Sequence, residues 1–290
     1  MSSPDVTAGR PAAWRAWLQI ARISNTPTVV SNAIAGAVLV STSPDGGTVA
    51  LVAIAMALFY TAGMVLNDIA DAEIDRRQRP ERPIPSGAIS PRAAQTAFAA
   101  LIGAGVAILA VLDWRALVAG LVLVALIIAY DFWHKGNALS PVLMAACRAM
   151  VYVVAAFAVA GALNDDVWGA AAMLLVYVVG LTQVAKAEGS GIAARWPVVA
   201  VLAPAVYWAK ELTDLAVALL LIAFVVWAGY ALWLVLAERQ IGAGVVRLIA
   251  GIAIYDALVV AGAGGGAVAL TACLLAFAAT IALQTKIAGT

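Results

Sequence analysis

Charged side chains are scarce in this sequence. They make up 11% of the 290 residues, whereas soluble domains carry about 25%. Hydrophobic residues make up 64% of the chain, and the mean hydropathy is +1.00. The net charge of only +1 excludes the strongly basic balance that is typical of nucleic-acid-binding proteins. The shortage of charge predicts one integral membrane domain over residues 1–290.

Cysteine and histidine are also rare. Cys147 and Cys273 both lie inside apolar segments, so we interpret them as small core residues rather than a disulfide pair, and they leave the redox compartment open. His134 is the only histidine and has no cluster of ligands around it, which favours a loop residue over a general base or a metal ligand. Residues 1–13 are polar and lack the pattern of a cleavable signal peptide. These absences direct attention to the acidic and basic side chains.

Long apolar stretches are abundant instead. Most of them approach the length of about 20 residues that a helix needs to cross a bilayer. The seventh stretch is short and contains Pro197 and Pro204, so we expect ten spans, with nine as the alternative. The predicted fold class is therefore all-α, a polytopic membrane helical bundle. The predicted spans are 23–41, 48–67, 92–112, 115–132, 140–162, 167–187, 195–210, 215–237, 244–262 and 266–285.

The basic residues predict how the bundle is oriented. Fourteen lysines and arginines fall on the side of segment 67–92, two fall on the opposite side, and Arg148 lies within a span. Because basic residues accumulate on the cytoplasmic side of a cell membrane, we expect 67–92 and 182–195 to be cytoplasmic loops. Ahead of the first span, residues 12–23 alternate apolar and polar side chains, which predicts an interfacial amphipathic helix.

The most charged segment begins directly after the second predicted span. Asp68, Asp71 and Asp75 are spaced three and four residues apart, so on a helix their carboxylates share one face. Such charges cost several kcal/mol each inside a bilayer, which argues against a filler role. Carboxylates with cations beside them are typical of a divalent-metal site that receives a phosphorylated substrate. The cations that follow are Arg76, Arg77, Arg79 and Arg82.

This segment resembles the first signature of the UbiA superfamily of membrane prenyltransferases. The signature, Asn-Asp-x-x-Asp-x-x-x-Asp, runs here from Asn67 to Asp75, and Arg-Pro-x-Arg-Pro-x-Pro-Ser-Gly follows at 79–87. The resemblance implies a nine-helix core, to which a tenth span would be an addition. It also implies transfer of an isoprenoid chain from an allylic polyprenyl diphosphate to a small acceptor, with water excluded from the cavity.

The resemblance also implies roles for individual residues. It assigns Asp68, Asp71 and Asp75 to catalysis, because Mg²⁺ held by these carboxylates neutralises the diphosphate as it departs. It assigns the binding of the substrate to Asn67 and to the basic side chains beside it, which complete the charge balance. Those basic side chains are Arg79 and Arg82.

The second signature of the family, a further acidic cluster after the sixth span, is not matched. Its place holds one acid, Glu188, with Lys186 two residues before it on the helix face of Thr182. Either Glu188 alone holds a second metal ion and Lys186 replaces part of a cation's charge, or that ion is absent; a topogenic lysine with a capping glutamate is a third reading. This departure, with Ala-Cys-Arg-Ala-Met-Val-Tyr at 146–152, resembles the divergent EboC-like branch found in secondary-metabolite clusters.

Polar residues inside the predicted spans are further candidates. Arg148 either contacts a phosphate deep in the site or forms a buried pair. Asp256 could pair with Arg148, line the acceptor pocket or be merely hydrogen-bonded, and we favour a structural role. Asn25 and Asn32 lie on one face of the first span, and Asn25 occupies a position that lines the cavity in the resembled family. Asp131 borders the expected cytoplasmic mouth.

The identity of the acceptor is open at this point. The resembled family handles aromatic acids, quinone precursors, sugar phosphates and cyclitols, so an aromatic or polyol-like acceptor is expected. The alternative function is a lipid or metabolite transporter that has kept the scaffold without transferase activity. Such carriers often contain inverted repeats, and the sequence has no convincing internal repeat, which favours the enzyme.

Overall fold

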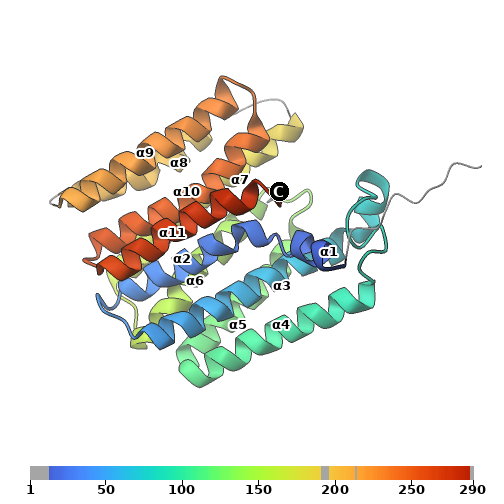
Figure 1. The fold of residues 1–290 in the computed structure, drawn as a ribbon, viewed down its shortest axis with the longest axis horizontal. Coiled ribbons are helices and arrows are strands. Elements are labelled where there is room, and N and C mark those ends of the chain that lie inside the picture. Colours follow the sequence, from blue (N-terminus) through green and yellow to red (C-terminus); the bar gives the residue numbers. More distant parts are fainter. Residues whose placement is uncertain (1–12, 191–195, 213, 288–290) are drawn as a thin grey trace, which may run out of the picture.

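The computed structural model describes residues 13–190, 196–212 and 214–287. Over these ranges the secondary structure is helical, without a β-strand (Figure 1), which confirms the all-α fold class. A short helix α1 (Ala13–Ile20) and a 3₁₀ turn η1 (Ile23–Asn25) precede the bundle, and a second 3₁₀ turn η2 (Ala209–Glu211) interrupts it. The helices of the bundle are α2 (Thr26–Val38), α3 (Gly46–Gln78), α4 (Pro91–Leu112), α5 (Trp114–Trp133), α6 (Ser140–Ala160), α7 (Asp165–Ser190), α8 (Trp196–Trp208), α9 (Leu215–Leu236), α10 (Ile241–Gly262) and α11 (Ala267–Gln284).

Each of the ten predicted apolar stretches overlaps with one of these helices. Not every one of these helices is long enough to cross a membrane. Among the described residues, eight helices are long and apolar enough to cross a membrane, namely α3 to α7 and α9 to α11. Helices α2 and α8 have 13 residues each, fewer than the about 20 that a span needs. Helix α2 is shortened because η1 takes the first residues of its stretch, and α8 carries Pro204 in its interior. Of the ten predicted spans, eight therefore coincide with a described helix that is long enough to cross a membrane by itself.

The outward faces of the long helices are apolar. On α9, for example, Leu215 is 75% exposed and Val226 is 64% exposed. Large apolar side chains on an outer surface suit lipid rather than water, and a helix that is apolar all round is typical of a membrane span. Together with the eight candidate spans, this surface makes the protein a multi-pass membrane protein.

Helix α3 continues well beyond its predicted end. Asp45 caps its start by accepting a hydrogen bond from the Thr48 amide at 2.8 Å, and the helix ends at Gln78, two residues before Pro80. With 33 residues it is about 50 Å long, which exceeds the thickness of the hydrocarbon core. The predicted loop 67–92 is therefore helical in its first part, and residues 79–90 make the connection. Helix α7 likewise continues through most of the predicted loop 182–195, of which residues 191–195 lie outside the described part.

Helix α1 packs over the connection that follows α3 (Figure 1). Its buried face presents Ala16 and Ile20, which join an apolar cluster with Ile84 and Ile89 of the connection and Val65 of α3. Trp14 points outward and is 58% exposed. The predicted amphipathic helix at 12–23 thus exists over Ala13–Ile20, and its apolar face covers the charged end of the bundle.

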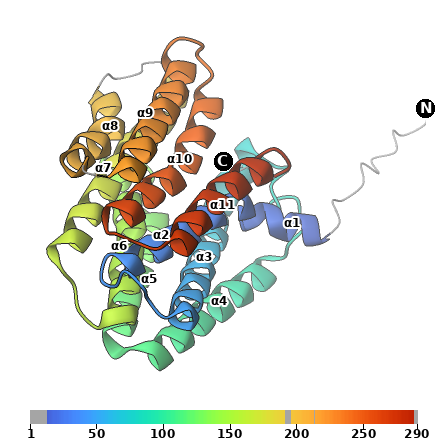
Figure 2. The same cartoon turned by 60° about the vertical axis from the view of Figure 1, so that its left-hand side comes forward.

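Helix α2 lies at the centre of the bundle, against α3, α6, α10 and α11 (Figure 2). Its close approach to α6 depends on Gly36, because a Cβ there would lie 2.7 Å from the Tyr152 Cα. Two large apolar clusters flank α2, and polar side chains of α2 enter the space between them. The central helix thus connects the charged end of the bundle with its interior.

Candidate functional site

A cavity of about 490 Å³ opens between α3, α5, α6, α7 and α10. Five cationic side chains line it, from the residue before η1, the connection after α3, α6 and α7: Arg22, Arg79, Arg82, Arg148 and Lys186. Most of the remaining lining is apolar, with Met56, Phe59, Leu123, Ile127, Val151 and Ile252 among its members. The cavity therefore combines an apolar interior with an excess of positive charge. This arrangement suits an anion with a hydrophobic tail.

The structure places most of the predicted substrate-binding residues on this cavity. Asn25, Arg79, Arg82, Arg148 and Lys186 all line its wall, although they are up to 161 positions apart in the sequence. The Asn25 side chain also accepts a hydrogen bond from Gln284 of α11 at 3.1 Å between Oδ1 and Nε2. Chain segments from both ends of the protein therefore meet at one site.

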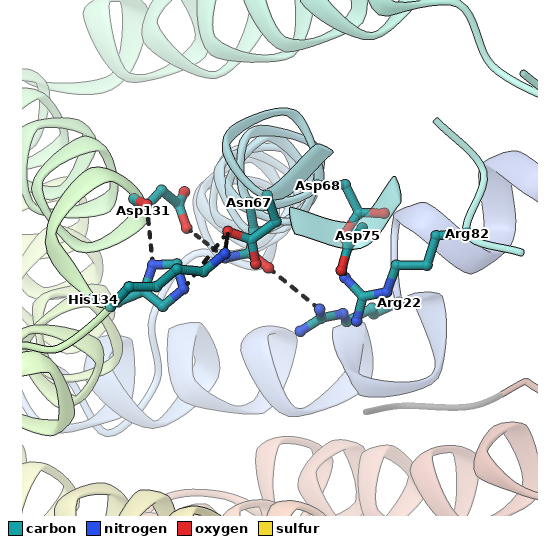
Figure 3. A network of polar contacts seen from close by, with 9 residues as sticks. Arg22, Asn67, Asp68, Asp75, Arg82, Asp131 and His134 are labelled. Carbon is teal, nitrogen blue, oxygen red and sulfur yellow. Dashed lines mark hydrogen bonds and ion pairs between the residues drawn. The ribbon is translucent and has the colours of Figure 1, made fainter. Parts of the chain in front are cut away.

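Two of the three predicted catalytic aspartates share an arginine. Asp68 and Asp75 lie two turns apart on α3, each only 5% exposed. Arg82 reaches back from the following connection, with its Nη1 at 3.0 Å from Asp75 Oδ2 and at 3.4 Å from Asp68 Oδ1 (Figure 3). Arg82 also lines the cavity, so its guanidinium lies between these carboxylates and the cavity space.

Asp71 is held from a different direction. Its Oδ1 lies 2.5 Å from Lys135 Nζ and 3.8 Å from His134 Nε2, both just beyond the end of α5. The predicted stripe of three carboxylates thus divides, because Asp71 turns towards α5 whereas Asp68 and Asp75 turn towards Arg82. His134 follows the last residue of α5, and this places the residue interpreted as a loop histidine next to the aspartates.

Asn67 connects α3 with two neighbouring segments (Figure 3). Its Oδ1 accepts from Arg22 Nη2 at 3.4 Å, and its Nδ2 donates to Asp131 Oδ1 at 3.1 Å. Asp131 is 4% exposed and lines the cavity, and its second oxygen, Oδ2, has no hydrogen-bond partner among the described residues. A buried carboxylate oxygen without a partner is costly, so Asp131 presents an open acceptor to a ligand.

Two of these site residues were not singled out from the sequence. Arg22 counted only as one of many basic residues, yet its backbone is left-handed (φ 43, ψ 48), which turns the chain from α1 into η1 beside the cavity. Asp131 was noted only as bordering the mouth, although an acid in the last turn of an apolar helix is itself a signal. The position of Arg22 required the tertiary fold, since no local pattern marks the turn.

The oxygen donors of α3 fit magnesium in their chemistry. Mg²⁺ prefers carboxylate and water oxygens, and Asp68, Asp71 and Asp75 offer such carboxylates on one helix. In this structure each of the three is paired with a cation, and among the described residues no three acidic, histidine or cysteine side chains converge as a metal site. The side chain of Glu188, the fourth predicted ligand, lies outside the described part of the chain.

The position of the second family signature is occupied by other groups. Lys186 Nζ donates to Ser140 Oγ of α6 at 2.7 Å, and Thr182 Oγ1 donates to the Val178 carbonyl at 2.7 Å. Both residues line the cavity. This wall of the cavity therefore carries a lysine and a hydroxyl group where the resembled family carries carboxylates.

A buried network lies behind Arg148. Its Nη1 donates to Asn32 Oδ1 at 3.1 Å, and Asn32 Nδ2 donates to both oxygens of Asp256, at 2.8 and 2.9 Å. Ser31 and Tyr152 also donate to Asp256. The side chains of Asp256, Asn32, Ser31 and Tyr152 are all fully buried. Asp256 is therefore hydrogen-bonded by neutral donors from α2 and α6 and connects to Arg148 only through Asn32.

Comparison with known proteins agrees with this geometry. Residues 29–260 match the sequence pattern of the UbiA prenyltransferase family. The chain is 32% identical over 125 residues to the digeranylgeranylglyceryl phosphate synthase of Methanopyrus kandleri, covering 43% of this chain and 46% of that protein. It is 32% identical over 133 residues to the 4-hydroxybenzoate octaprenyltransferase of Sodalis glossinidius, covering 42% and 44%. Each of these alignments thus spans less than half of the relative's length.

Solved structures share the fold. A structure of digeranylgeranylglyceryl phosphate synthase superposes with a TM-score of 0.65 at 19% identity, over 87% of this chain and 99% of that chain. A UbiA homologue from Archaeoglobus fulgidus, bound to DMAPP and Mg²⁺, superposes with a TM-score of 0.53 at 16% identity, over 93% and 99%. The family match covers most of the chain, and these structures repeat its architecture. The chain therefore belongs to the UbiA prenyltransferase family.

Proposed function

We propose that this protein is an integral-membrane prenyltransferase. It moves an isoprenoid chain from an allylic polyprenyl diphosphate to a small acceptor, with Mg²⁺ as the cofactor. The observation that carries the proposal is the cavity. Its interior is apolar, and its charged end, here called the mouth, is lined by Arg22, Arg79, Arg82 and Lys186 and lies next to the three aspartates of α3. Relatives named as prenyltransferases and a homologue bound to DMAPP and Mg²⁺ support the same chemistry.

The donor binds with its diphosphate at the mouth. Arg22, Arg79, Arg82 and Lys186 line this part of the cavity and offer charge-assisted hydrogen bonds to the phosphate oxygens. Asn67 and Asn25 supply amide groups beside them. The isoprenoid tail lies along the apolar lining, which replaces the lipid around it with side chains of similar polarity.

Asp68, Asp71 and Asp75 would hold Mg²⁺ at this mouth, with Glu188 as a further candidate ligand. When bound, the ion neutralises the diphosphate and so makes it a better leaving group. Because Arg82 and Lys135 pair with these carboxylates in the structure, the same cations are close enough to turn to the phosphate oxygens instead. Arg82 and Lys135 would thus add positive charge beside the ion that the three aspartates hold.

The residues of the chain stabilise the departure of the diphosphate. The bond between the allylic carbon and the diphosphate oxygen breaks, and arginines of the mouth donate to the oxygens that gain negative charge. The apolar lining with the rings of Phe59 and Tyr60 shields the cationic allylic carbon from water. The nucleophile of the acceptor then forms the new bond, and Asp131 Oδ2 is available to accept its proton.

The mouth faces the cytoplasm in this proposal, and the protein lies in the cell membrane. The support is the distribution of lysine and arginine, with 14 on the side of the mouth and two on the other. The whole chain acts as one transferase domain, since segments from α2 to α10 line a single cavity.

The proposal is tested with the full-length protein in nanodiscs, given geranylgeranyl diphosphate, Mg²⁺ and a panel of acceptors. We expect release of pyrophosphate and a prenylated product in the mass spectrum, both of which stop when Mg²⁺ is chelated. Asp68→Ala is expected to stop both as well, whereas Asp166→Ala, which removes an exposed acid in the first turn of α7, is the matched control and retains activity. Transport of a labelled isoprenoid across the bilayer without product formation would favour the transporter alternative and overturn the enzyme.

A further inference from the structure

Arg247 is a cation on the face of α10 that points away from the cavity. Val245 and Ile249 line the cavity, and Arg247 lies two positions from each of them, which on a helix is the opposite face. Helices α9 and α11 flank α10 (Figure 1). Within the part of the chain that the structure describes, no carboxylate lies within ion-pair distance of the Arg247 guanidinium. Among those residues its charge is therefore unmatched, and it lies outside the proposed active site.

The Arg247 side chain extends towards the end of α10 that lies on the side of the mouth. Its Nη1 donates to the Ala243 carbonyl at 3.0 Å, which is one turn nearer to the start of the helix at Ile241. The α9–α10 turn and the end of α3 lie at the same end of the bundle (Figure 1). Since α10 has 22 residues and is about 33 Å long, its first turn lies at the edge of the hydrocarbon core. The guanidinium is therefore at the depth of the lipid headgroups, with most of its five N–H donors left for a ligand.

Aromatic rings of α9 surround this guanidinium. Its central carbon lies 5.6 Å from the centroid of the Tyr230 ring, and Tyr230 stacks on Trp233 with 6.1 Å between their ring centroids. Tyr230 is 42% exposed and Trp233 is 50% exposed. Tyrosine and tryptophan are typical of the boundary between lipid and water, where one end of the ring is apolar and the other is wet. The rings therefore offer apolar surface directly beside an available cation.

Close contacts between the helices keep these groups in place. Gly244 lets α10 approach α9, because a Cβ there would lie 2.7 Å from the Ala231 carbonyl oxygen. Trp227 of α9 donates from Nε1 to the Arg247 carbonyl at 2.8 Å, and its ring meets Phe277 of α11 edge-on with 4.8 Å between the centroids. The cation and the rings are thus held together by three helices before any ligand binds, which lowers the entropy cost of binding.

We infer that Arg247, Tyr230 and Trp233, here called the Arg247 site, bind the headgroup of an anionic phospholipid of the surrounding membrane. The free N–H groups of the guanidinium donate to the phosphate oxygens, and an acyl chain lies along the exposed rings. A phospholipid is the occupant because this face of a multi-pass protein is turned to the bilayer, where basic groups between helices attract anionic headgroups. Since the opposite face of α10 lines the cavity, the bound lipid supports the cavity wall from outside.

Competition between two lipids tests the inference with the full-length protein in detergent micelles. Phosphatidylglycerol has a net negative charge, whereas phosphatidylcholine with the same acyl chains has none. The two are added in equal amounts, and native mass spectrometry counts the bound molecules of each. We expect the wild type to retain phosphatidylglycerol about 5-fold or more over phosphatidylcholine. Phosphatidylglycerol should also raise the unfolding temperature more than phosphatidylcholine does, because it binds the folded state.

Variants then assign the preference to the Arg247 site. Arg247→Gln is expected to reduce the preference to about 2-fold or less. Arg247→Lys keeps the charge without the planar fork and should retain an intermediate preference, which also provides a folded variant for the comparison. Tyr230→Leu should weaken the retention of phosphatidylglycerol by about 3-fold. The matched control is Arg92→Gln, which removes an exposed arginine at the start of α4 and should leave the preference unchanged.

Several outcomes would overturn the inference. Equal retention of the two lipids by the wild type would do so, and so would an unchanged preference in Arg247→Gln. Displacement of phosphatidylglycerol by an equal concentration of inorganic phosphate would indicate a simple anion site in place of a lipid site. Displacement by geranylgeranyl diphosphate, equal in the wild type and in Arg247→Gln, would move the bound lipid to the mouth. A preference that depends on Arg247 supports the inference whether or not the protein forms a prenylated product.

Discussion

The aspartates at the mouth and the aspartate in the interior are held in opposite ways. Asp68 and Asp75 are paired with Arg82, a long cation from a connection outside the helices. Asp256 is bound by Ser31, Asn32 and Tyr152, which are neutral side chains on helices. A long cation can exchange one anion for another, whereas short donors fixed on two helices cannot. The pairing at the mouth therefore suits the exchange of one anion for another. The hydrogen bonds of Asp256 instead hold α2, α6 and α10 together, and Asn32 connects them to Arg148.

The largest effect is expected for the mouth. Asp68→Ala and Asp71→Ala should each lower the rate of prenyl transfer by about 1000-fold or more, because each removes a carboxylate that would hold Mg²⁺ against the diphosphate. Single-turnover measurement of product formation checks this, with the unfolding temperature in detergent as the control for folding. Retained activity in both variants would refute the metal site, and the contrast between the two kinds of aspartate would then disappear.

The next largest effect is expected for the interior, and on stability. Asp256→Ala should lower the free energy of unfolding by about 3 kcal/mol, because it leaves the donors of Ser31, Asn32 and Tyr152 buried without an acceptor. Reversible denaturation in mixed micelles measures the change. Asp68→Ala serves as the comparison and should cost less than Asp256→Ala, since its partner Arg82 keeps Asp75. Equal losses in the two variants would contradict the distinction.

A smaller effect is expected at the boundary between the two regions. Asp131→Asn should lower kcat by about 10- to 100-fold with little change in the KM for the donor, because the amide keeps the shape but cannot accept a proton. Steady-state kinetics at saturating donor check this. Phe132→Leu, an exposed position in the same turn that is not part of the cavity lining, is the control and should stay within about 3-fold of the wild type. A changed donor KM with an unchanged kcat would move Asp131 from the acceptor to the diphosphate.

The smallest effect is expected for the contact between Gln284 and Asn25. Gln284→Ala should change the KM for the donor by about 5-fold or less, because one neutral hydrogen bond contributes about 1 kcal/mol. Asn25→Ala should exceed it, since Asn25 itself lines the cavity. An equal effect of the two changes would show that Asn25 acts only through its position.

The fold was largely predictable because its signals are local. Apolar length located all ten helices of the bundle, and acidic spacing located the residues of the mouth. The predicted ends of elements are wrong where the composition of the sequence changes but the helix continues. Residues 67–78 read as a loop because charge begins there, but α3 continues until the approach of Pro80, since a helix may leave the bilayer without ending. At α2 the converse holds, because the apolar stretch 23–41 begins with a 3₁₀ turn and only then becomes a helix.

The site was predictable in its membership more than in its geometry. A motif identified Asn67 and the three aspartates, but the pairing of Asp71 with Lys135 joins residues 64 positions apart, and no spacing rule reaches across that distance. A direct pair between Arg148 and Asp256 was one of the alternatives that the sequence left open, whereas in the structure Asn32 stands between the two side chains.

The last helix affects how the protein can be engineered. The family match ends at residue 260, and α11 follows it, packs along α2 and α10, and touches Asn25 through Gln284 (Figure 2). A shortened version that stops where the family resemblance stops would keep every residue of the motif and lose this support of the cavity wall. Assays on such a trimmed chain would describe a different binding surface, so libraries and fusions should be built with the C-terminal helix intact.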